Sequence, residues 1–167
     1  IKKIIDNINV PFRMQTNAKL LDKLPIKYLK KIEKILISID GDKGRTDYNR
    51  GEGTFDLVVK NIKQAKKQGY EGEIVARMTL SEFPDIYDQV KNILKLNLFD
   101  SIHWQLDMGF YKFDYGKDRV TKFVNKYNKG ITKLTHFWLN KMEHGNVIRL
   151  YPFIGIMDSL LKNEKTK

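Results

Sequence analysis

Four short apolar runs alternate along the chain with longer amphipathic stretches, and this alternation predicts strands separated by helices. The runs have the length of strands and cover residues 12–17, 34–39, 73–80 and 101–106. The amphipathic stretches repeat apolar residues at helical spacing, and the helices that we expect cover residues 18–32, 54–70, 81–97, 118–143 and 152–163. A short helix tail over residues 1–8 and a weak strand over residues 146–151 complete the pattern.

Glycine, proline and hydroxyl residues mark where the expected helices begin and end. Thr54 and Ser81 stand before amphipathic stretches as N-caps, and Gly69 stands where one of them stops. Pro25 indicates a break or a second start in the first expected helix, and Gly130 is a candidate break in the long C-terminal one. These residues therefore set the expected ends of most helices.

The order of the elements is strand, helix, strand, helix, repeated along the chain. This order predicts an α/β fold with parallel strands and right-handed crossovers. Two architectures remain open at this point, a doubly wound sheet and all or part of a β/α barrel. One segment departs from the rhythm, because the strand over residues 34–39 runs into a long polar segment, residues 40–53, that we expect to be a loop.

Each strand has one apolar face and one face that becomes polar toward its carboxyl end. Central strands of a doubly wound sheet are apolar on both faces, and a filled barrel packs apolar side chains inside. Polar faces instead favour an open or partly filled barrel with helices outside and a polar ligand inside. Two alternatives are that the strands are less buried than this implies, or that the assigned phase is wrong by one residue. The polar side chains are Asn17, Ser38, Asp40, Arg77, Gln105 and Asp107.

This set of side chains indicates the kind of ligand that the polar face could hold. Arg pairs with a carboxylate, Asp accepts hydrogen bonds from an amine or a ribose hydroxyl, and Ser, Asn and Gln fix orientation. The set therefore suits a zwitterionic ligand that carries hydroxyl groups. It does not suit a phosphate group, because the sequence has neither a GxGxxG nor a Walker motif, and "RGEG" (50–53) lacks the spacing of a phosphate loop.

Composition narrows the possible chemistry of these 167 residues. The length fits one domain, residues 1–167, and because the first residue is Ile we expect a piece of a longer protein. The absence of cysteine excludes disulfides, thiolate metal sites and iron–sulfur ligation within these residues, and the three histidines are too scattered for a metal site. We find no secretory leader and no apolar run long enough to span a membrane, so we expect a cytoplasmic protein without a membrane partner.

The net charge of +11 raises the question of nucleic-acid binding. Most of the basic residues are lysines on the expected helices, as at positions 63, 66 and 67 and at positions 126, 129 and 133, and no aromatic stacking motif accompanies them. A solvated lysine-rich surface explains this better than a nucleic-acid partner does. The alternative that stays open is a non-enzymatic basic α/β module that binds nucleic acid or another small polar ligand.

A series of short motifs resembles the core of radical S-adenosylmethionine enzymes. The resemblance is greatest to the peptide-modifying branch with C-terminal SPASM or twitch extensions, and it runs from about residue 12 to residue 106. Each motif is short, but their order and spacing together are specific. In order they are "TNAKLL", "ISIDG", "TDYNRGEGTFDLVVKNI", "ARMTL" and "HWQL".

The resemblance implies a partial (β/α)6 barrel of the TIM type, with residues 107–167 forming the barrel end or a bridge to a C-terminal extension. It implies an enzyme that binds S-adenosylmethionine and a [4Fe–4S] cluster and modifies a peptide or protein through a 5′-deoxyadenosyl radical. The family binds its cluster through a CxxxCxxC loop, which this cysteine-free chain would need outside these residues. We therefore expect the chain on its own to be inactive.

Matching positions imply roles for individual residues. Ser38 is expected to touch the ribose or amino-acid part of S-adenosylmethionine, and Arg77 its carboxylate. Gln105 and Asp107 are expected to face adenosine or substrate. The aromatic segment 107–116 could contact substrate or only cover the barrel rim.

Three more positions of the motifs are expected to bind the cofactor, namely Asn17, Asp40 and Arg50. For two of them a structural role is open as well. Asp40 could simply cap the loop that follows it, and Arg50 could form a salt bridge with Asp40 or Asp47. One departure from the family pattern is Asp42, because many relatives have proline at this position, which leaves the conformation of the loop open.

Overall fold

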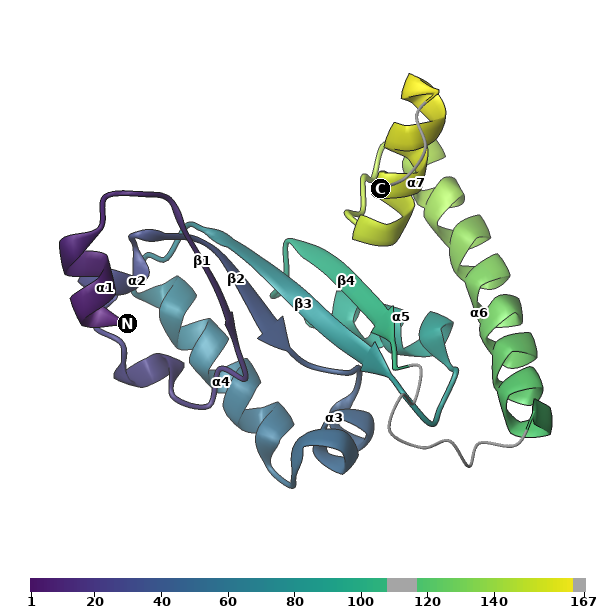
Figure 1. Cartoon of the computed structure of the whole chain (residues 1–167), viewed down its shortest axis with the longest axis horizontal. Coiled ribbons are helices and arrows are strands. Elements are labelled where there is room, and N and C mark those ends of the chain that lie inside the picture. Colours follow the sequence, from purple (N-terminus) through teal and green to yellow (C-terminus); the bar gives the residue numbers. More distant parts are fainter. Residues whose placement is uncertain (108–116, 164–167) are drawn as a thin grey trace.

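A sheet of four parallel strands organises the chain, and a computed structural model describes residues 1–107 and 117–163 of it. The strands neighbour one another in sequence order, as Figure 1 shows. This is the simple order that right-handed strand–helix–strand crossovers produce. The strands are β1 (Phe12–Thr16), β2 (Ile32–Ser38), β3 (Glu73–Leu80) and β4 (Ser101–Leu106).

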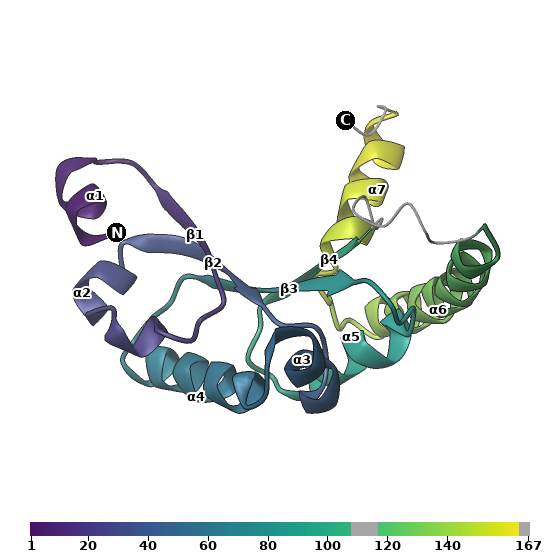
Figure 2. The ribbon, with the colours of Figure 1, turned by 60° about the horizontal axis from the view of Figure 1, so that its bottom comes forward.

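Most helices lie on one side of this sheet. Figure 2 shows α3, α4 and α5 beneath one face, α6 beyond α5, and α7 rising beside β4 on the other side. The helical elements are α1 (Lys2–Asn7), the 3-10 turn η1 (Leu21–Lys23), α2 (Ile26–Leu29), α3 (Lys43–Arg50), α4 (Thr54–Lys67), α5 (Ile86–Lys95), α6 (Lys117–Glu143) and α7 (Tyr151–Lys162).

The core lies between the sheet and these helices. Ile35 and Ile37 of β2 and Ile39 directly after it are completely buried, and they alternate with residues on the other face. Val58 of α4 and Val90 of α5 are also completely buried and belong to the same cluster. The apolar faces predicted for the strands are therefore the faces that pack against the helices.

The opposite face of the sheet is polar and partly open, as predicted. Gln15 of β1 and Gln105 of β4 are exposed on it, and Arg77 of β3 is half-buried. A doubly wound sheet would have helices over both faces. The α/β prediction is confirmed, and the parallel sheet with its outer helices corresponds to part of a TIM-like barrel.

The predicted helix over residues 18–32 was wrong. The structure has only η1 and the four-residue α2 there, and β2 begins at Ile32. Ile32 pairs with Phe12 and is buried, so sheet pairing and burial override the helical spacing of this segment. The expected break at Pro25 is present, because Pro25 stands at the N-cap of α2.

Residues 40–53 are not the plain loop that we expected, because they contain α3. The carboxylate of Asp42 accepts a hydrogen bond from the Arg45 backbone N–H at 2.9 Å and caps this helix. Thr54 is the first residue of α4 rather than its cap, and its hydroxyl donates to the Arg50 carbonyl at 3.1 Å. The expected stop at Gly69 is confirmed, since α4 ends two residues earlier and Gly69 has a φ of 87°.

Three further boundaries differ from the predicted ones. α5 begins at Ile86 rather than after Ser81, because the N-cap is Asp85. α6 continues through Gly130 without a break. The weak strand over residues 146–151 is reduced to an isolated bridge between Leu150 and β4, and α7 follows at once.

Candidate functional site

Polar side chains from three neighbouring strands form a row on the open face of the sheet. The strand register pairs Ser38 with Arg77 and Arg77 with His103. Two residues nearer the carboxyl ends of β3 and β4, Thr79 pairs with Gln105. The Arg77 guanidinium donates a hydrogen bond from Nη2 to Gln105 Oε1 at 2.7 Å. The structure therefore brings three of the predicted site residues together, Ser38, Arg77 and Gln105.

His103 is a member of this row that the sequence analysis did not select. Its ring nitrogen Nδ1 is buried and has no hydrogen-bond partner among residues 1–107 and 117–163. Burial lowers the pKa of His103, and the neighbouring Arg77 charge lowers the pKa further. Its position, two residues before Gln105 on the same strand face, was the signal that could have identified it.

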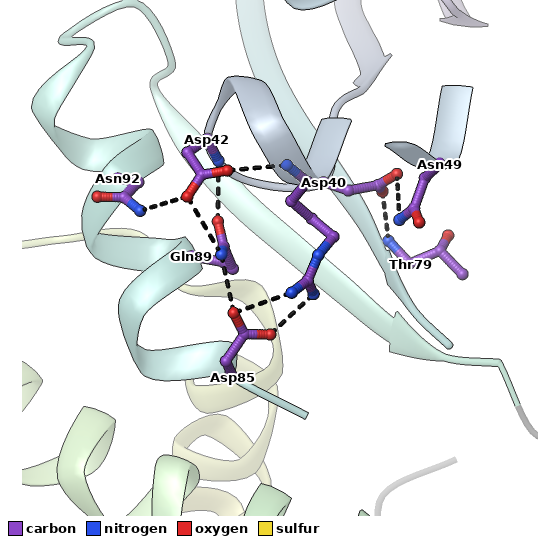
Figure 3. Close-up of polar contacts among 8 residues, drawn as sticks. Asp40, Asp42, Asn49, Thr79, Asp85, Gln89 and Asn92 are labelled. Carbon is purple, nitrogen blue, oxygen red and sulfur yellow. Dashed lines mark hydrogen bonds and ion pairs between the residues drawn. The ribbon is translucent and has the colours of Figure 1, made fainter. Parts of the chain in front are cut away.

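Asp40 lies just after β2 and is held by three donors, of which Figure 3 shows Asn49 and Thr79. Arg50 Nη2 donates to its Oδ1 at 2.7 Å, and the Thr79 backbone N–H donates to the same oxygen at 2.9 Å. Asn49 Nδ2 donates to Asp40 Oδ2 at 3.1 Å. Only 4% of Asp40 is exposed, so its carboxylate is used within the protein to fix the loop after β2.

Arg50 therefore makes the salt bridge with Asp40 that the sequence analysis left open as a structural role. One of its donors remains unused, because Arg50 Nε is buried without a partner within the described part of the chain. The predicted contacts of Asp40 and Arg50 with a cofactor stay predictions.

A second polar network ties the loop after β2 to α5 (Figure 3). The Asp42 backbone N–H donates to Gln89 Oε1 at 2.8 Å, and Gln89 Nε2 donates to Asp85 at 2.8 Å. Arg45 binds Asp85 through both guanidinium nitrogens, at 2.8 and 3.1 Å. Asn92 donates to the Asp42 carboxylate at 3.2 Å. None of these contacts between the loop and α5 was predicted from the sequence.

The electrostatics of this network favour the ionised form of Asp85. Burial alone would raise the pKa of Asp85, but hydrogen bonds from Gln89 and Arg45 outweigh it, and the pKa lies below its usual value. Asp42 supplies the cap of α3, which gives the loop after β2 a defined conformation.

Two other predicted residues lie at the ends of strands, apart from the row. Asn17 follows β1, is exposed, and accepts a hydrogen bond from the Lys19 backbone N–H at 3.1 Å. Asp107 follows β4, and its backbone N–H donates to the Leu80 carbonyl at 2.8 Å. The aromatic residues expected to contact substrate or cover the rim lie in 108–116, outside the described residues.

The described ranges, residues 1–107 and 117–163, contain neither a metal-ligand cluster nor a membrane-spanning helix. Within them no three His, Cys, Asp or Glu side chains are grouped so that they could hold a metal ion. No helix there is long and apolar enough to cross a membrane.

Comparison with known proteins gives a sequence relative and structural neighbours that differ in function. No family model matches the chain. Cytidine diphosphoramidate kinase of Campylobacter jejuni is 35% identical over 112 residues, which are 64% of this chain and 61% of the kinase. The chain thus spans less than two thirds of that relative.

The structural neighbours include the anaerobic sulfatase-maturating enzyme anSMEcpe, a radical S-adenosylmethionine enzyme, with bound AdoMet. The native form superposes with a TM-score of 0.70 and 18% identity, over 97% of this chain and 46% of the enzyme. A complex with AdoMet and the Cp18Cys peptide gives a TM-score of 0.67 and 20% identity. At this identity the likeness shows the fold, and the chain spans under half of these enzymes.

Proposed function

We propose that the chain is the S-adenosylmethionine-binding core segment of a radical enzyme that modifies a peptide or protein. The observation that carries this proposal is the row formed by Ser38, Arg77 and His103 on the open face of a partial barrel. The order of the sequence motifs and the likeness to AdoMet-bound structures support it. In this proposal residues 1–167 form one domain, and 107–167 form the barrel end or a bridge to a SPASM-type or twitch-type extension.

The side chains of this chain can bind S-adenosylmethionine, but they include no thiolate ligand for a [4Fe–4S] cluster. A [4Fe–4S] cluster needs thiolate ligands, and the chain has no cysteine, so its ligands would lie outside these residues and no step is derived through it. For S-adenosylmethionine the open face offers a guanidinium, a hydroxyl, an amide and an imidazole whose buried Nδ1 has no partner within the described ranges.

The proposed roles follow from the donors and acceptors. Arg77 holds the cofactor carboxylate, because only one of its guanidinium N–H donors binds Gln105 and the others can bind a planar anion. Ser38 and Gln105 orient the polar groups of the cofactor. His103 stays neutral at physiological pH, since its lowered pKa keeps a second positive charge away from the sulfonium. When bound, the cofactor supplies the radical precursor.

The peptide substrate is part of the same proposal. The structural neighbours include complexes of anSMEcpe with AdoMet and the peptides Cp18Cys and Kp18Cys. An open sheet face with polar residues at its rim can admit an extended substrate. The chain by itself lacks cluster ligands, and we expect it to bind cofactor without radical activity.

Titration with S-adenosylmethionine tests the proposal, using protein made from the complete reading frame. Arg77→Ala removes the proposed carboxylate ligand, and we expect at least about a tenfold loss of affinity in calorimetry, as for a charge-assisted pair. Arg149→Ala is the matched control, because it removes the same charge from an exposed position before α7. Equal losses of affinity in the two variants would contradict the proposal that the chain is part of a radical S-adenosylmethionine enzyme. A reading frame that encodes no CxxxCxxC motif upstream of Ile1 would contradict it as well.

A second candidate, a kinase reaction, is favoured by the 35% identity to cytidine diphosphoramidate kinase. Two observations weigh against it. The sequence has no GxxxxGK[ST] loop to cradle phosphates, and the loop after β2 is instead occupied by the Asp40 and Asp42 carboxylates. Incubation with ATP and cytidine diphosphoramidate separates the candidates, since phosphate transfer would establish the kinase.

A further inference from the structure

A pocket of about 450 Å³ lies outside the sheet, between α5 and α6, with α3 contributing one side chain. It belongs to the helix layer and shares no residue with the row on the open face. Its volume is in the range of pockets that hold small organic ligands. The lining residues are Arg45, Phe83, Pro84, Asp85, Tyr87, Asp88, Lys126, Lys129, Gly130 and Lys133.

Three lysines give the pocket its charge. Lys126, Lys129 and Lys133 follow one another at spacings of three and four residues, so they lie on one side of α6. Within the part of the chain that the structure describes, none of the three has a hydrogen bond or an ion pair. Like charges at this spacing repel each other on a helix, and a bound anion would relieve that repulsion.

The carboxylates of the lining do not cancel this charge. Asp85 is already paired with Arg45 through two hydrogen bonds. Asp88 is exposed and provides one negative charge against the three lysines. The lining as a whole carries four basic and two acidic side chains, and its ligand should therefore be an anion.

Aromatic rings form the other part of the lining. The Phe83 ring is held by the Arg45 guanidinium, 4.1 Å from its centroid, and by the edge of Tyr48 at 5.6 Å. The Tyr87 ring is held edge-on by Phe137 at 6.2 Å. Two fixed rings beside three cations suit a ligand that has both a flat aromatic part and anionic groups.

Gly130 allows α6 to pack closely against α5, the two helices that border the pocket. A Cβ atom at this position would lie 2.9 Å from Ile86 Cγ2, so only glycine lets α6 pass so close to α5. This contact places the lysines of α6 opposite Tyr87 of α5. It also explains why a glycine at the middle of a long helix does not break it.

We propose that this pocket binds a nucleoside polyphosphate. The lysines hold the phosphate groups, and the base packs against Phe83 and Tyr87. A simple inorganic anion would leave the aromatic wall unused. An extended nucleic acid would use the other lysine-rich helix, α4, equally well, because Lys60, Lys63 and Lys67 have the same spacing as the three lysines of α6.

Calorimetric titration of the chain with ADP and with inorganic pyrophosphate, at about 0.15 M salt, tests this assignment. The first variant carries Lys126→Ala, Lys129→Ala and Lys133→Ala, and we expect it to lose at least about tenfold in ADP affinity. The matched variant carries Lys60→Ala, Lys63→Ala and Lys67→Ala on α4, with the same change in charge, and we expect less than about a twofold effect. All six lysines are exposed, so both variants should melt as the wild type does.

Phe83→Leu tests the aromatic half of the assignment. We expect it to weaken ADP binding and to leave pyrophosphate binding unchanged, because only the base contacts the ring. The proposal is overturned if ADP does not bind at about 1 mM, or if both triple variants lose affinity equally. It is also overturned if pyrophosphate binds as tightly as ADP, or if a single-stranded oligonucleotide binds and ADP does not displace it.

Discussion

Gly41 lies at the point where the loop after β2 passes α5, and replacing it tests the described geometry directly. Its φ is 137°, which L-residues rarely adopt. A Cβ atom there would lie 1.9 Å from Gln89 Oε1 and 2.9 Å from Gln89 Cβ. Gln89 could turn its amide away, but its Cβ belongs to α5 and can move only with the helix.

The cost of Gly41→Ala can be worked from these contacts. The backbone strain of a non-glycine residue at positive φ costs about 1–2 kcal/mol. Moving the Gln89 amide loses its hydrogen bonds to the Asp42 N–H and to Asp85, each worth about 1 kcal/mol net. We therefore expect the free energy of unfolding to fall by about 3–4 kcal/mol.

Urea denaturation followed by circular dichroism measures this loss, and Gly53→Ala is the matched control. Gly53 also has a positive φ, 73°, but a Cβ atom there would meet nothing within 4 Å. It should therefore lose only the strain, about 1–2 kcal/mol. Equal losses for the two substitutions would refute the close packing of the loop on α5. Adding Gln89→Ala to Gly41→Ala should cost less than the sum of the single losses.

Two further predictions concern titrating groups. Burial alone would raise the pKa of Glu73, but hydrogen bonds from Lys34, Tyr151 and Ser101 outweigh it and lower the pKa. The stability that Glu73 contributes is therefore complete above its unfolded pKa and is lost as the pH falls, so Glu73→Gln should flatten the acid limb of the stability profile. NMR titration should place the pKa of His103 below its ordinary value; Arg77→Ala should raise it only partly, because burial is the larger cause.

Each of these two predictions has an outcome that contradicts it. An acid limb as steep in Glu73→Gln as in the wild type would show that the carboxylate is not held by its three donors. A His103 pKa at or above the ordinary value would contradict its burial on the open face. A pKa that Arg77→Ala leaves unchanged would contradict its position beside Arg77.

The strands and their faces could be predicted because they depend on local alternation. Ile35, Ile37 and Ile39 alternate with Leu36, Ser38 and Asp40, and only one arrangement puts all three isoleucines in the core. The same alternation placed Ser38, Arg77 and Gln105 on the other face, where the structure has them. It could also have identified His103, whose place in the alternation is the same as that of Gln105.

The errors have a common physical origin in contacts between distant residues. The segment before β2 has helical spacing, but pairing with Phe12 makes Ile32 a strand residue. α5 begins directly after Asp85, whose carboxylate is bound by Arg45, forty residues earlier in the chain. Gly130 was a candidate break only because the sequence does not show that α6 passes close to Ile86 there.

The sequence by itself determined the α/β order, the parallel strands, the polar face and the absence of thiolate ligands, because periodicity and composition depend on local pattern alone. Only the tertiary structure decided which polar residues bind each other. It pairs the buried Asp40 with Arg50, ties Asp42 and Arg45 to α5 and its N-cap, and leaves Arg77 and His103 on the open face. The reason is that a side chain's partners are set by how distant segments meet in space.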